Sequence, residues 1–291
     1  MLTSPTESMA YGRALLILGR TSNLPTVWSN CLAGWLLAGG GPVTRFCWLC
    51  LGATFLYLGG MFLNDAYDIE FDRQYRRERP IPSGAITLEE VWKWVFGWFG
   101  CGAVILIMLG QTTALLTVIL VGCIVLYDAI HKAITCSPVL MALCRFLLYV
   151  VAASAAGNGV TGLAIWSALA LGAYIIGLSY LARKENARGP LGHWPCYLLA
   201  MPILLASLVN SGEFRKPGLL LSLILGLWIL RCLRHTFGAG DRNVGRTVSG
   251  LLAGIVLVDL LAVAGATPLI SLVFVLLFVA ALLFQRFVPA T

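Results

Sequence analysis

Apolar runs of about twenty residues fill most of the sequence, and they limit its fold more than any other feature. The hydrophobic share is 59% of 291 residues, and the runs are separated by short polar connections. A helix needs about 20 residues to cross the hydrocarbon core of a bilayer. Because peptide groups inside a bilayer must bond to one another, each run has to be helical. The sequence therefore predicts an all-α, polytopic transmembrane helical bundle.

The expected spans can be placed from the apolar runs and the polar residues between them. They are 14–39, 44–66, 87–109, 112–130, 137–157, 161–182, 196–210, 217–236, 246–265 and 268–288. Nine or ten spans are both possible, because 196–210 is short and only Ala266-Thr267-Pro268 divides the last two. We expect a short N-terminal tail at 1–12, followed by one transmembrane domain at 13–291.

The basic residues are distributed unevenly between the two ends of the expected spans. The net charge is +7, and most Lys and Arg residues lie in the N-terminal segment and the even-numbered connections. The odd-numbered connections carry only Arg45, Arg215 and Lys216. The positive-inside tendency therefore predicts an integral, multi-pass membrane protein whose N-terminus and charged loops face the cytoplasm. Its partners should be membrane lipids or an anionic substrate, with no nucleic acid.

Cysteine usage gives little indication of disulfides or of a zinc site. Nine cysteines are scattered through the chain, mostly within apolar runs, where a free Cys behaves as a small hydrophobic residue. The pair at Cys47 and Cys50 has CxxC spacing, but no second Cys or His pair lies nearby in the sequence. These residues are therefore interpreted as packing or lipid-facing positions.

One connection is unusually rich in charge. It reads NDAYDIEFDRQYRRERPIPSG at residues 64–84, and nine of its first sixteen residues are charged, whereas charged residues make up 11% of the whole chain. Topology explains the arginines but not the acids. On a helix, Asp65, Asp68 and Asp72 lie within about 60° of one another, and like charges one turn apart repel. The arrangement is costly unless a cation bridges the carboxylates.

The three aspartates offer hard oxygen ligands of the kind that Mg²⁺ prefers. Asn64 can add an amide oxygen, while Arg76 and Arg77 lie about one turn beyond and can contact phosphate oxygens. The simpler alternative is that these acids and arginines only form structural ion pairs. We favour a site that binds a diphosphate through Mg²⁺.

The pattern Asn64-Asp65-x-x-Asp68-x-x-x-Asp72, followed by Arg79-Pro80-Ile81-Pro82-Ser83-Gly84, resembles a known family. It is similar to the first aspartate-rich motif and the RPLPSG segment of the UbiA superfamily of intramembrane prenyltransferases. The segment from Arg20 to Asn30 resembles the family's first helix, and Tyr127 and Lys132 resemble a Tyr and a Lys that follow its fourth helix.

The resemblance implies a lipid-open cavity where Mg²⁺ holds a prenyl diphosphate, whose ionisation gives an allylic cation that a hydrophobic or aromatic acceptor captures. The implied metal ligands are Asn64, Asp65, Asp68 and Asp72. The implied catalytic residues are Asp68, Asp72, Lys132 and Lys184. The implied substrate-binding residues are Asn23, Asn30, Asn64, Arg76, Arg77, Arg79, Tyr127, Arg145, Tyr180, Arg183 and Glu185.

A second aspartate-rich motif is usual in that family at the end of the sixth span, and this chain departs from it. The matching stretch, 179–190, reads SYLARKENARGP, with Glu185 as its one acid. Arg183 and Lys184 can neutralise a diphosphate without a second metal ion. They can equally close a helix and anchor it at the membrane interface. The YLARxE form is similar to the UbiA-like EboC group, which is linked to export or modification of small metabolites.

Two hypotheses of different class follow. The first is a Mg²⁺-dependent prenyltransferase. The second is a catalytically divergent UbiA-like protein that binds or transports a hydrophobic metabolite. A third reading, a CDP-alcohol phosphatidyltransferase, shares the aspartates, but its longer signature is absent from the sequence.

Three further charged residues fall within or beside the expected spans. Asp128 is one turn before Lys132 and can form a salt bridge with it. Arg145 lies about eight residues into its span, where its long side chain can extend to the interface and reach the diphosphate. Asp259 lies inside the 246–265 span, where a charge is expensive and usually paired or functional.

Overall fold

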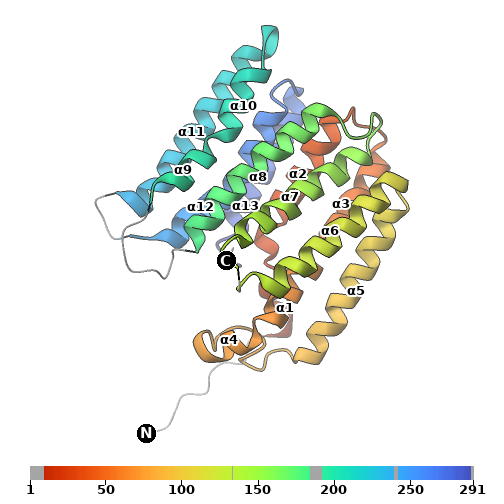
Figure 1. Ribbon diagram of the computed structural model, residues 1–291, viewed down its shortest axis with the longest axis vertical. Coiled ribbons are helices and arrows are strands. Elements are labelled where there is room, and N and C mark those ends of the chain that lie inside the picture. Colours follow the sequence, from red (N-terminus) through yellow and green to blue (C-terminus); the bar gives the residue numbers. More distant parts are fainter. Residues whose placement is uncertain (1–9, 133, 184–191, 239–241, 290–291) are drawn as a thin grey trace.

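The computed structural model describes residues 10–132, 134–183, 192–238 and 242–289, which form a bundle of helices (Figure 1). In this part of the chain, seven helices are long and apolar enough to cross a membrane. They are α3 (Val43–Tyr67), α5 (Leu88–Ile107), α6 (Gln111–Ile130), α7 (Ser137–Ser154), α8 (Gly162–Ala182), α11 (Arg215–Phe237) and α12 (Val244–Ala262). The prediction of an all-α polytopic bundle is confirmed, and the protein is an integral membrane protein.

Shorter helices complete the bundle. They are α1 (Tyr11–Leu18), α2 (Leu24–Leu37), α4 (Ile69–Tyr75), α9 (Trp194–Leu199), α10 (Met201–Val209) and α13 (Pro268–Phe284). The run expected at 196–210 is thus two short helices in sequence. The last span begins at Pro268, the first position of a helix, where the missing N–H of proline costs no hydrogen bond.

The first span differs from the prediction of one continuous helix at 14–39. It is interrupted after α1 at Arg20, which has φ 40° and is the only described non-glycine residue with positive φ. A short 3₁₀ turn, Thr21–Asn23, then leads into α2. Pro25 is at the start of α2, and proline in the interior of a longer helix would remove a backbone hydrogen bond. The interruption turns the Arg20 side chain toward α3.

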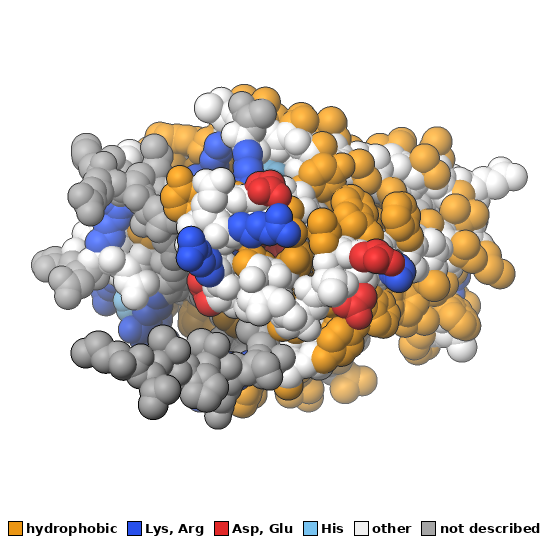
Figure 2. Space-filling view, turned by 90° about the horizontal axis from the view of Figure 1, so that it is seen from below, with side chains coloured by type: hydrophobic (Ala, Val, Ile, Leu, Met, Phe, Trp, Pro, Cys, Tyr) orange, Lys and Arg blue, Asp and Glu red, His pale blue; other side chains and the backbone are white. Residues whose placement is uncertain are grey.

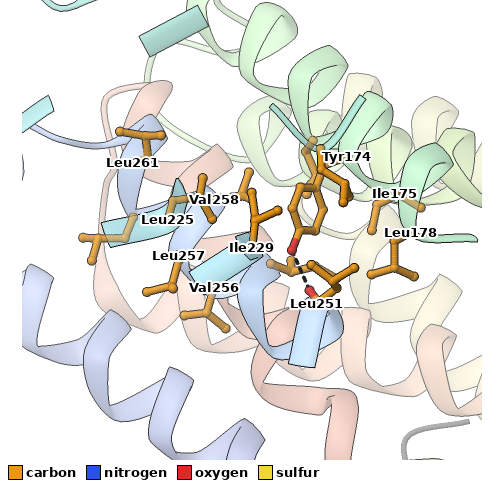
Figure 3. Close-up of a cluster of buried hydrophobic side chains, with 14 of the residues drawn as sticks. Tyr174, Ile175, Leu178, Leu225, Ile229, Leu251, Val256, Leu257, Val258 and Leu261 are labelled. Carbon is orange, nitrogen blue, oxygen red and sulfur yellow. Dashed lines mark hydrogen bonds between the residues drawn. The ribbon is translucent and has the colours of Figure 1, made fainter. Parts of the chain in front are cut away.

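Two large hydrophobic clusters hold the helices together. One joins α2, α3, α5, α6 and α7, and the other joins mainly α7, α8, α11 and α12. In the second cluster the buried Tyr174 donates a hydrogen bond to the carbonyl of Leu251 at 2.8 Å, which links α8 to α12 (Figure 3). Gly34 lets α2 approach α7 closely, since a Cβ there would lie 2.5 Å from the Tyr149 carbonyl oxygen.

Charged side chains gather at one end of the bundle. Lys, Arg, Asp and Glu side chains gather on the end of the molecule that carries α4, while apolar side chains dominate the flank beside it (Figure 2). This end is called the α4 end below. It holds the charged stretch that the sequence singles out.

Candidate active site

The site begins where α3 ends. Asp68 follows the last residue of α3, and α4 starts at Ile69. The amide of Asp68 still donates to the Asn64 carbonyl at 3.0 Å, and the amide of Asp72 donates to the Asp68 carbonyl at 2.9 Å. Helical spacing is therefore kept across the junction, as the sequence pattern predicts.

Asp65 is buried, with 3% of its surface exposed, and it contacts two arginines. Its Oδ1 lies 3.2 Å from Nη2 of Arg20, and its Oδ2 lies 3.5 Å from Nη1 of Arg79. Nη2 of Arg20 also donates to Oδ1 of Asn64 at 3.1 Å. Sequence reasoning did not include Arg20 in the site. The signal for it was a lone arginine that ends the apolar run ALLILG.

Asp68 is held by two cations from the connection after α6. Its Oδ1 lies 2.6 Å from Nζ of Lys132 and 3.4 Å from Nε2 of His131. Burial raises the pKa of the Asp68 carboxyl, but hydrogen bonds from His131 and Lys132 outweigh it and leave the pKa below its usual value. The same hydrogen bond to Asp68 raises the pKa of His131. Lys132 also lies over the Phe71 ring, 4.6 Å from its centroid.

Asp128 does not form the salt bridge with Lys132 that its spacing allows. The lysine contacts Asp68 instead, and Asp128 accepts a hydrogen bond from Nδ2 of Asn64 at 3.0 Å. The other carboxylate oxygen of Asp128 is buried and accepts no hydrogen bond within the described residues. Because Asp128 occupies the amide nitrogen of Asn64, the amide oxygen of Asn64 is directed to Arg20.

Asp72 is the third aspartate and the least paired. It is 4% exposed and makes no ion pair within the described part of the chain. Burial raises the pKa of its carboxyl, and the charges of Arg79 and Arg76 oppose that shift. Arg77 is exposed, and its Nε donates to the backbone carbonyl of Arg73 at 3.3 Å.

The aspartates do not converge on one point in this structure. Across the described ranges, no three His, Cys, Asp or Glu residues lie close enough together to hold a metal ion. Each of Asp65 and Asp68 is directed to its own cations. The chemistry of the donors nonetheless fits Mg²⁺, because buried carboxylates and the amide oxygen of Asn64 are hard ligands beside a phosphate-binding set of cations.

The end of α8 lies against the same connection and is bonded differently. Nη1 of Arg183 donates to the carbonyls of Ile134 at 3.3 Å and Thr135 at 2.7 Å, and to Oγ of Ser137 at 3.1 Å. The hydroxyl of Tyr180 donates to the Thr135 carbonyl at 3.4 Å. The predicted site residues Lys184 and Glu185 lie outside the described residues.

A second polar group lies deeper in the bundle. Nη1 of Arg145 donates to Oδ1 of Asn30 at 2.9 Å, and its Nη2 donates to Oγ1 of Thr26 at 3.1 Å. Oδ2 of Asp259 accepts from Nδ2 of Asn30 at 2.7 Å and from Oγ of Ser29 at 2.5 Å. The structure therefore turns Arg145 toward α2, and does not bring it into ion-pair contact with Asp65, Asp68 or Asp72.

The remaining predicted site residues lie between these groups. Asn23 is 5% exposed at the start of α2. Tyr127 is half-buried near the end of α6, and its ring stacks on His131 with centroids 5.2 Å apart. Tyr127 therefore lies beside the connection that carries Lys132, whereas Asn23 lies at the interruption of the first span.

Comparisons with known proteins agree with this architecture. The chain matches the model of the UbiA prenyltransferase family over residues 27–190. It is 32% identical over 112 residues to the digeranylgeranylglyceryl phosphate synthase of Sulfolobus acidocaldarius, which covers 37% of this chain and 41% of that protein. The protein of the same name from Metallosphaera sedula is 33% identical over 69 residues, 24% of each chain. The chain thus matches less than half the length of these curated relatives.

Solved structures share the fold over most of their length. A UbiA homologue from Aeropyrum pernix K1 has a TM-score of 0.65 at 14% identity, and the match covers 83% of this chain and 96% of that one. A UbiA homologue from Archaeoglobus fulgidus bound to GPP and Mg²⁺ has a TM-score of 0.64 at 14% identity, covering 94% and 97%. With a family match across more than half of its length and this shared fold, the chain belongs to the UbiA prenyltransferase family.

Proposed function

We propose that the protein is an intramembrane prenyltransferase that moves an isoprenoid group from a prenyl diphosphate to a hydrophobic or aromatic acceptor. The observation that carries the proposal is the part-buried cluster at the α4 end, in which Asp65 and Asp68 contact Arg20, Arg79 and Lys132. Family membership and the GPP and Mg²⁺ bound in the Archaeoglobus fulgidus homologue support it.

The proposed anion-binding residues are those already held against the carboxylates. Arg79 and Lys132 lie 3.5 Å and 2.6 Å from carboxylate oxygens of Asp65 and Asp68, so an incoming diphosphate can take over these cations with small side-chain movements. Arginine offers a planar fork for two phosphate oxygens, and lysine offers a compact charge. Arg76 is half-buried beside Asp72 and extends the same set.

The proposed metal ligands are Asn64, Asp65, Asp68 and Asp72. When bound there, Mg²⁺ would neutralise charge that builds on the departing diphosphate. Arg79 and Lys132 act in the same direction, because they stabilise the diphosphate more as its charge grows. The C1–O bond breaks with both electrons passing to the diphosphate. The acceptor then bonds to C1 and gives up one proton, which the diphosphate accepts.

The protein must also protect the allylic cation from water. Tyr127 and Tyr57 are half-buried next to the interruption at Arg20, where their ring faces can stabilise a cation. The apolar clusters around α2, α3 and α7 exclude water from the space behind them. Because they can stabilise the allylic cation, we propose that the rings of Tyr57 and Tyr127 lie near the reacting carbon of the prenyl group.

A second candidate is a family member that binds or transports a hydrophobic metabolite without transferring a prenyl group. The observation that favours it is at the end of α8, where Tyr180 and Arg183 bond to the α6–α7 connection and the described residues 179–183 include no carboxylate. We propose that the three aspartates around the junction of α3 and α4 suffice for chemistry without a second acidic motif.

We also propose that the α4 end faces the cytoplasm, because the basic residues of the sequence gather in the connections at this end. Reporter fusions test the orientation. A periplasmic alkaline phosphatase fused in the α5–α6 connection should be active in a bacterial host, while the same reporter in the α6–α7 connection should be inactive. The reverse pattern would contradict the assignment.

The function is tested by release of pyrophosphate from purified, detergent-solubilised protein. The substrates are isoprenoid diphosphates from short to long, with pooled native lipid extract as acceptor, with and without Mg²⁺. We expect Mg²⁺-dependent release that Asp68→Asn abolishes while the temperature of unfolding stays close to that of the wild type. Saturable binding of the same diphosphates without any release would instead identify the binding or transport protein.

A further inference from the structure

Two charged residues inside the bundle, the part-buried Arg145 and the buried Asp259, are not used by the proposed diphosphate site. We propose that Arg145, positioned by Asp259 through Asn30, binds the anionic head group of the acceptor. The acceptor is then an amphipathic molecule that carries a carboxylate or a phosphate. This inference rests on the proposed function for the identity of the second substrate.

Arg145 has a charge that the described residues leave without a contacting anion. Its hydrogen-bond partners are neutral oxygens of Asn30 and Thr26, and no carboxylate lies within ion-pair distance of it in the described chain. Leu143, two positions earlier on α7, is 38% exposed on the outer surface, so Arg145 faces the interior. A charge inside a membrane protein usually pairs with another charge or serves a substrate. An anionic ligand supplies the missing partner.

Asp259 fixes the direction of this guanidinium without touching it. Both Asn30 and Ser29 donate to its Oδ2, so the nitrogen side of the Asn30 amide faces Asp259. The oxygen side of the same amide must then face Arg145. Asp259 is 0% exposed and comes from α12, far from α7 in the sequence. It is therefore a positioning residue for Arg145.

The Arg145 group is separate from the aspartates. Its guanidinium carbon lies 5.9 Å from the centroid of the Tyr57 ring. Tyr57 precedes Asn64 by seven residues on α3, which corresponds to about 10 Å along a helix. A diphosphate held at the aspartates and an anion held at Arg145 can thus occupy the protein together. The reacting carbon and the nucleophile of the acceptor would meet between them.

An apolar cavity lies about two helical turns before Tyr57 along α3. It has a volume of about 350 Å³ and is lined by Trp28, Leu32, Phe46, Cys50, Val273 and Leu277. On α3, Cys50, Thr54 and Tyr57 are spaced so that they share one helix face. The indole of Trp28 donates to the hydroxyl of Thr54 at 2.9 Å. Along this face the chain leads from Cys50 in the cavity wall to Tyr57, whose ring lies under the Arg145 guanidinium. A ligand with an apolar body in the cavity and an anionic head at Arg145 suits this order of residues.

Matched probes that differ only in the head group test the proposal. Lysophosphatidic acid is compared with the monoacylglycerol of the same chain, and dodecanoate with dodecanol. Dissociation constants are measured for the protein in nanodiscs, in the presence of geranyl diphosphate and Mg²⁺. Charge-assisted hydrogen bonds of this kind predict that one anionic probe binds at least about 10-fold more tightly than its neutral partner. The pair that shows the preference identifies phosphate or carboxylate as the head group.

Substitutions test whether Arg145 causes the preference for anionic over neutral probes. Arg145→Met should remove it and Arg145→Lys should restore part of it, while geranyl diphosphate binds as in the wild type. Asp259→Asn should reduce it by about 3-fold or more, since the amide of Asn30 loses its fixed orientation. Arg231→Met is the control, because Arg231 is an exposed arginine on α11 that lies over Trp228. Its substitution should leave the preference unchanged.

Three results would overturn the proposal. They are equal binding of charged and neutral probes, an anion preference that survives Arg145→Met, and a loss of geranyl diphosphate binding in Arg145→Met at wild-type thermal stability. The last result would show that Arg145 binds the diphosphate and not the acceptor. Anion preference that depends on Arg145, in a protein that releases no pyrophosphate, would support this subsite while contradicting the transferase itself.

Discussion

The ends of α3 and α8 meet the same connection between α6 and α7, but they bond to it in different ways. At the end of α3, the Asp68 carboxylate contacts the side chains of His131 and Lys132. At the end of α8, Arg183 donates to the backbone carbonyls of Ile134 and Thr135. A ligand can take over a cation that is paired with a carboxylate, because a phosphate offers an equivalent partner. It cannot replace a backbone carbonyl as easily.

The comparison separates residues that can respond to a substrate from residues that hold the fold. The end of α3 gathers reversible charge pairs around carboxylates that suit a metal ion. The end of α8 fixes the connection that carries Lys132. We therefore expect substitutions at the two ends to affect different measurements.

Beyond the loss of activity expected for Asp68→Asn, the largest effect is expected for Asp65→Asn. The change removes a proposed metal ligand and leaves the part-buried cations Arg20 and Arg79 without their carboxylate. Mg²⁺-dependent pyrophosphate release should fall by at least about 100-fold. Glu70→Gln is the matched control, since Glu70 is exposed on α4 and contacts Arg73 alone among the described charges. A third or more of wild-type activity in Asp65→Asn would contradict a site at the end of α3.

The next effect separates Lys132 from Arg183. Lys132→Gln should weaken geranyl diphosphate binding by about 10- to 100-fold, because charge-assisted contacts to phosphate are lost. Its unfolding temperature should change little, since Lys132 is partly exposed, with 45% of its side chain accessible. Titration of geranyl diphosphate, followed by thermal unfolding of the same samples, measures both.

Arg183→Gln should show the opposite pattern. The loss of hydrogen bonds to two carbonyls and to Ser137 should destabilise the protein by about 1–3 kcal/mol. Diphosphate binding should change less than in Lys132→Gln. If Arg183→Gln instead loses binding at unchanged stability, Arg183 is an anion-binding residue, as the basic sequence at 183–188 suggests, and the contrast between the two ends fails.

A packing variant tests the structural role of the α8 end by itself. A Cβ on Gly177 would lie 2.5 Å from the carbonyl oxygen of Pro195, so Gly177→Ala should force α8 away from α9. We expect a loss of about 1–3 kcal/mol in stability, measured by unfolding in detergent. Gly172→Ala on the same helix is the control, because its Cβ would meet no atom within 4 Å. Equal stability of the two variants would contradict close packing at this end.

The smallest effect is expected for Arg77, which follows α4 at the outer side of the proposed site. Arg77 is exposed and donates to a backbone carbonyl of its own segment. Arg77→Gln should change the dissociation constant of geranyl diphosphate by about 3-fold or less, because exposed charges are screened by solvent. A loss as large as that of Lys132→Gln would show that the diphosphate extends outward past α4.

Much of the fold and part of the site follow from the sequence. The apolar runs predict the helices to within a few residues, because span length is set by the bilayer. The spacing of Asp65, Asp68 and Asp72 predicts their shared place at the end of α3. The interruption of the first span was not predicted, because hydropathy does not distinguish a continuous helix from one broken at a residue with positive φ.

Contacts between distant segments could not be predicted in this way. Asn30 meets Arg145 and Asp259 across 115 and 229 residues of sequence, and nothing local in either segment specifies that meeting. The pairing of Lys132 with Asp68, in place of Asp128, was also outside local spacing rules. These contacts depend on how the helices pack, which a single sequence does not show directly.

The bridge from Arg145 to Asp259 also bears on how the chain is made. The helix α7 enters the bilayer before α12 has been synthesised, so Arg145 and the polar residues of α2 first reside there without the Asp259 carboxylate. A charged residue at the centre of a helix costs about 2.5–3.5 kcal/mol on insertion. Arrival of α12 then completes the hydrogen bonds of Ser29 and Asn30. A truncated chain that lacks α12 would therefore keep Ser29 and Asn30 without their hydrogen bonds to Asp259. Such unpaired polar groups inside the membrane distinguish an incomplete bundle from a complete one, and a degradation system can recognise them.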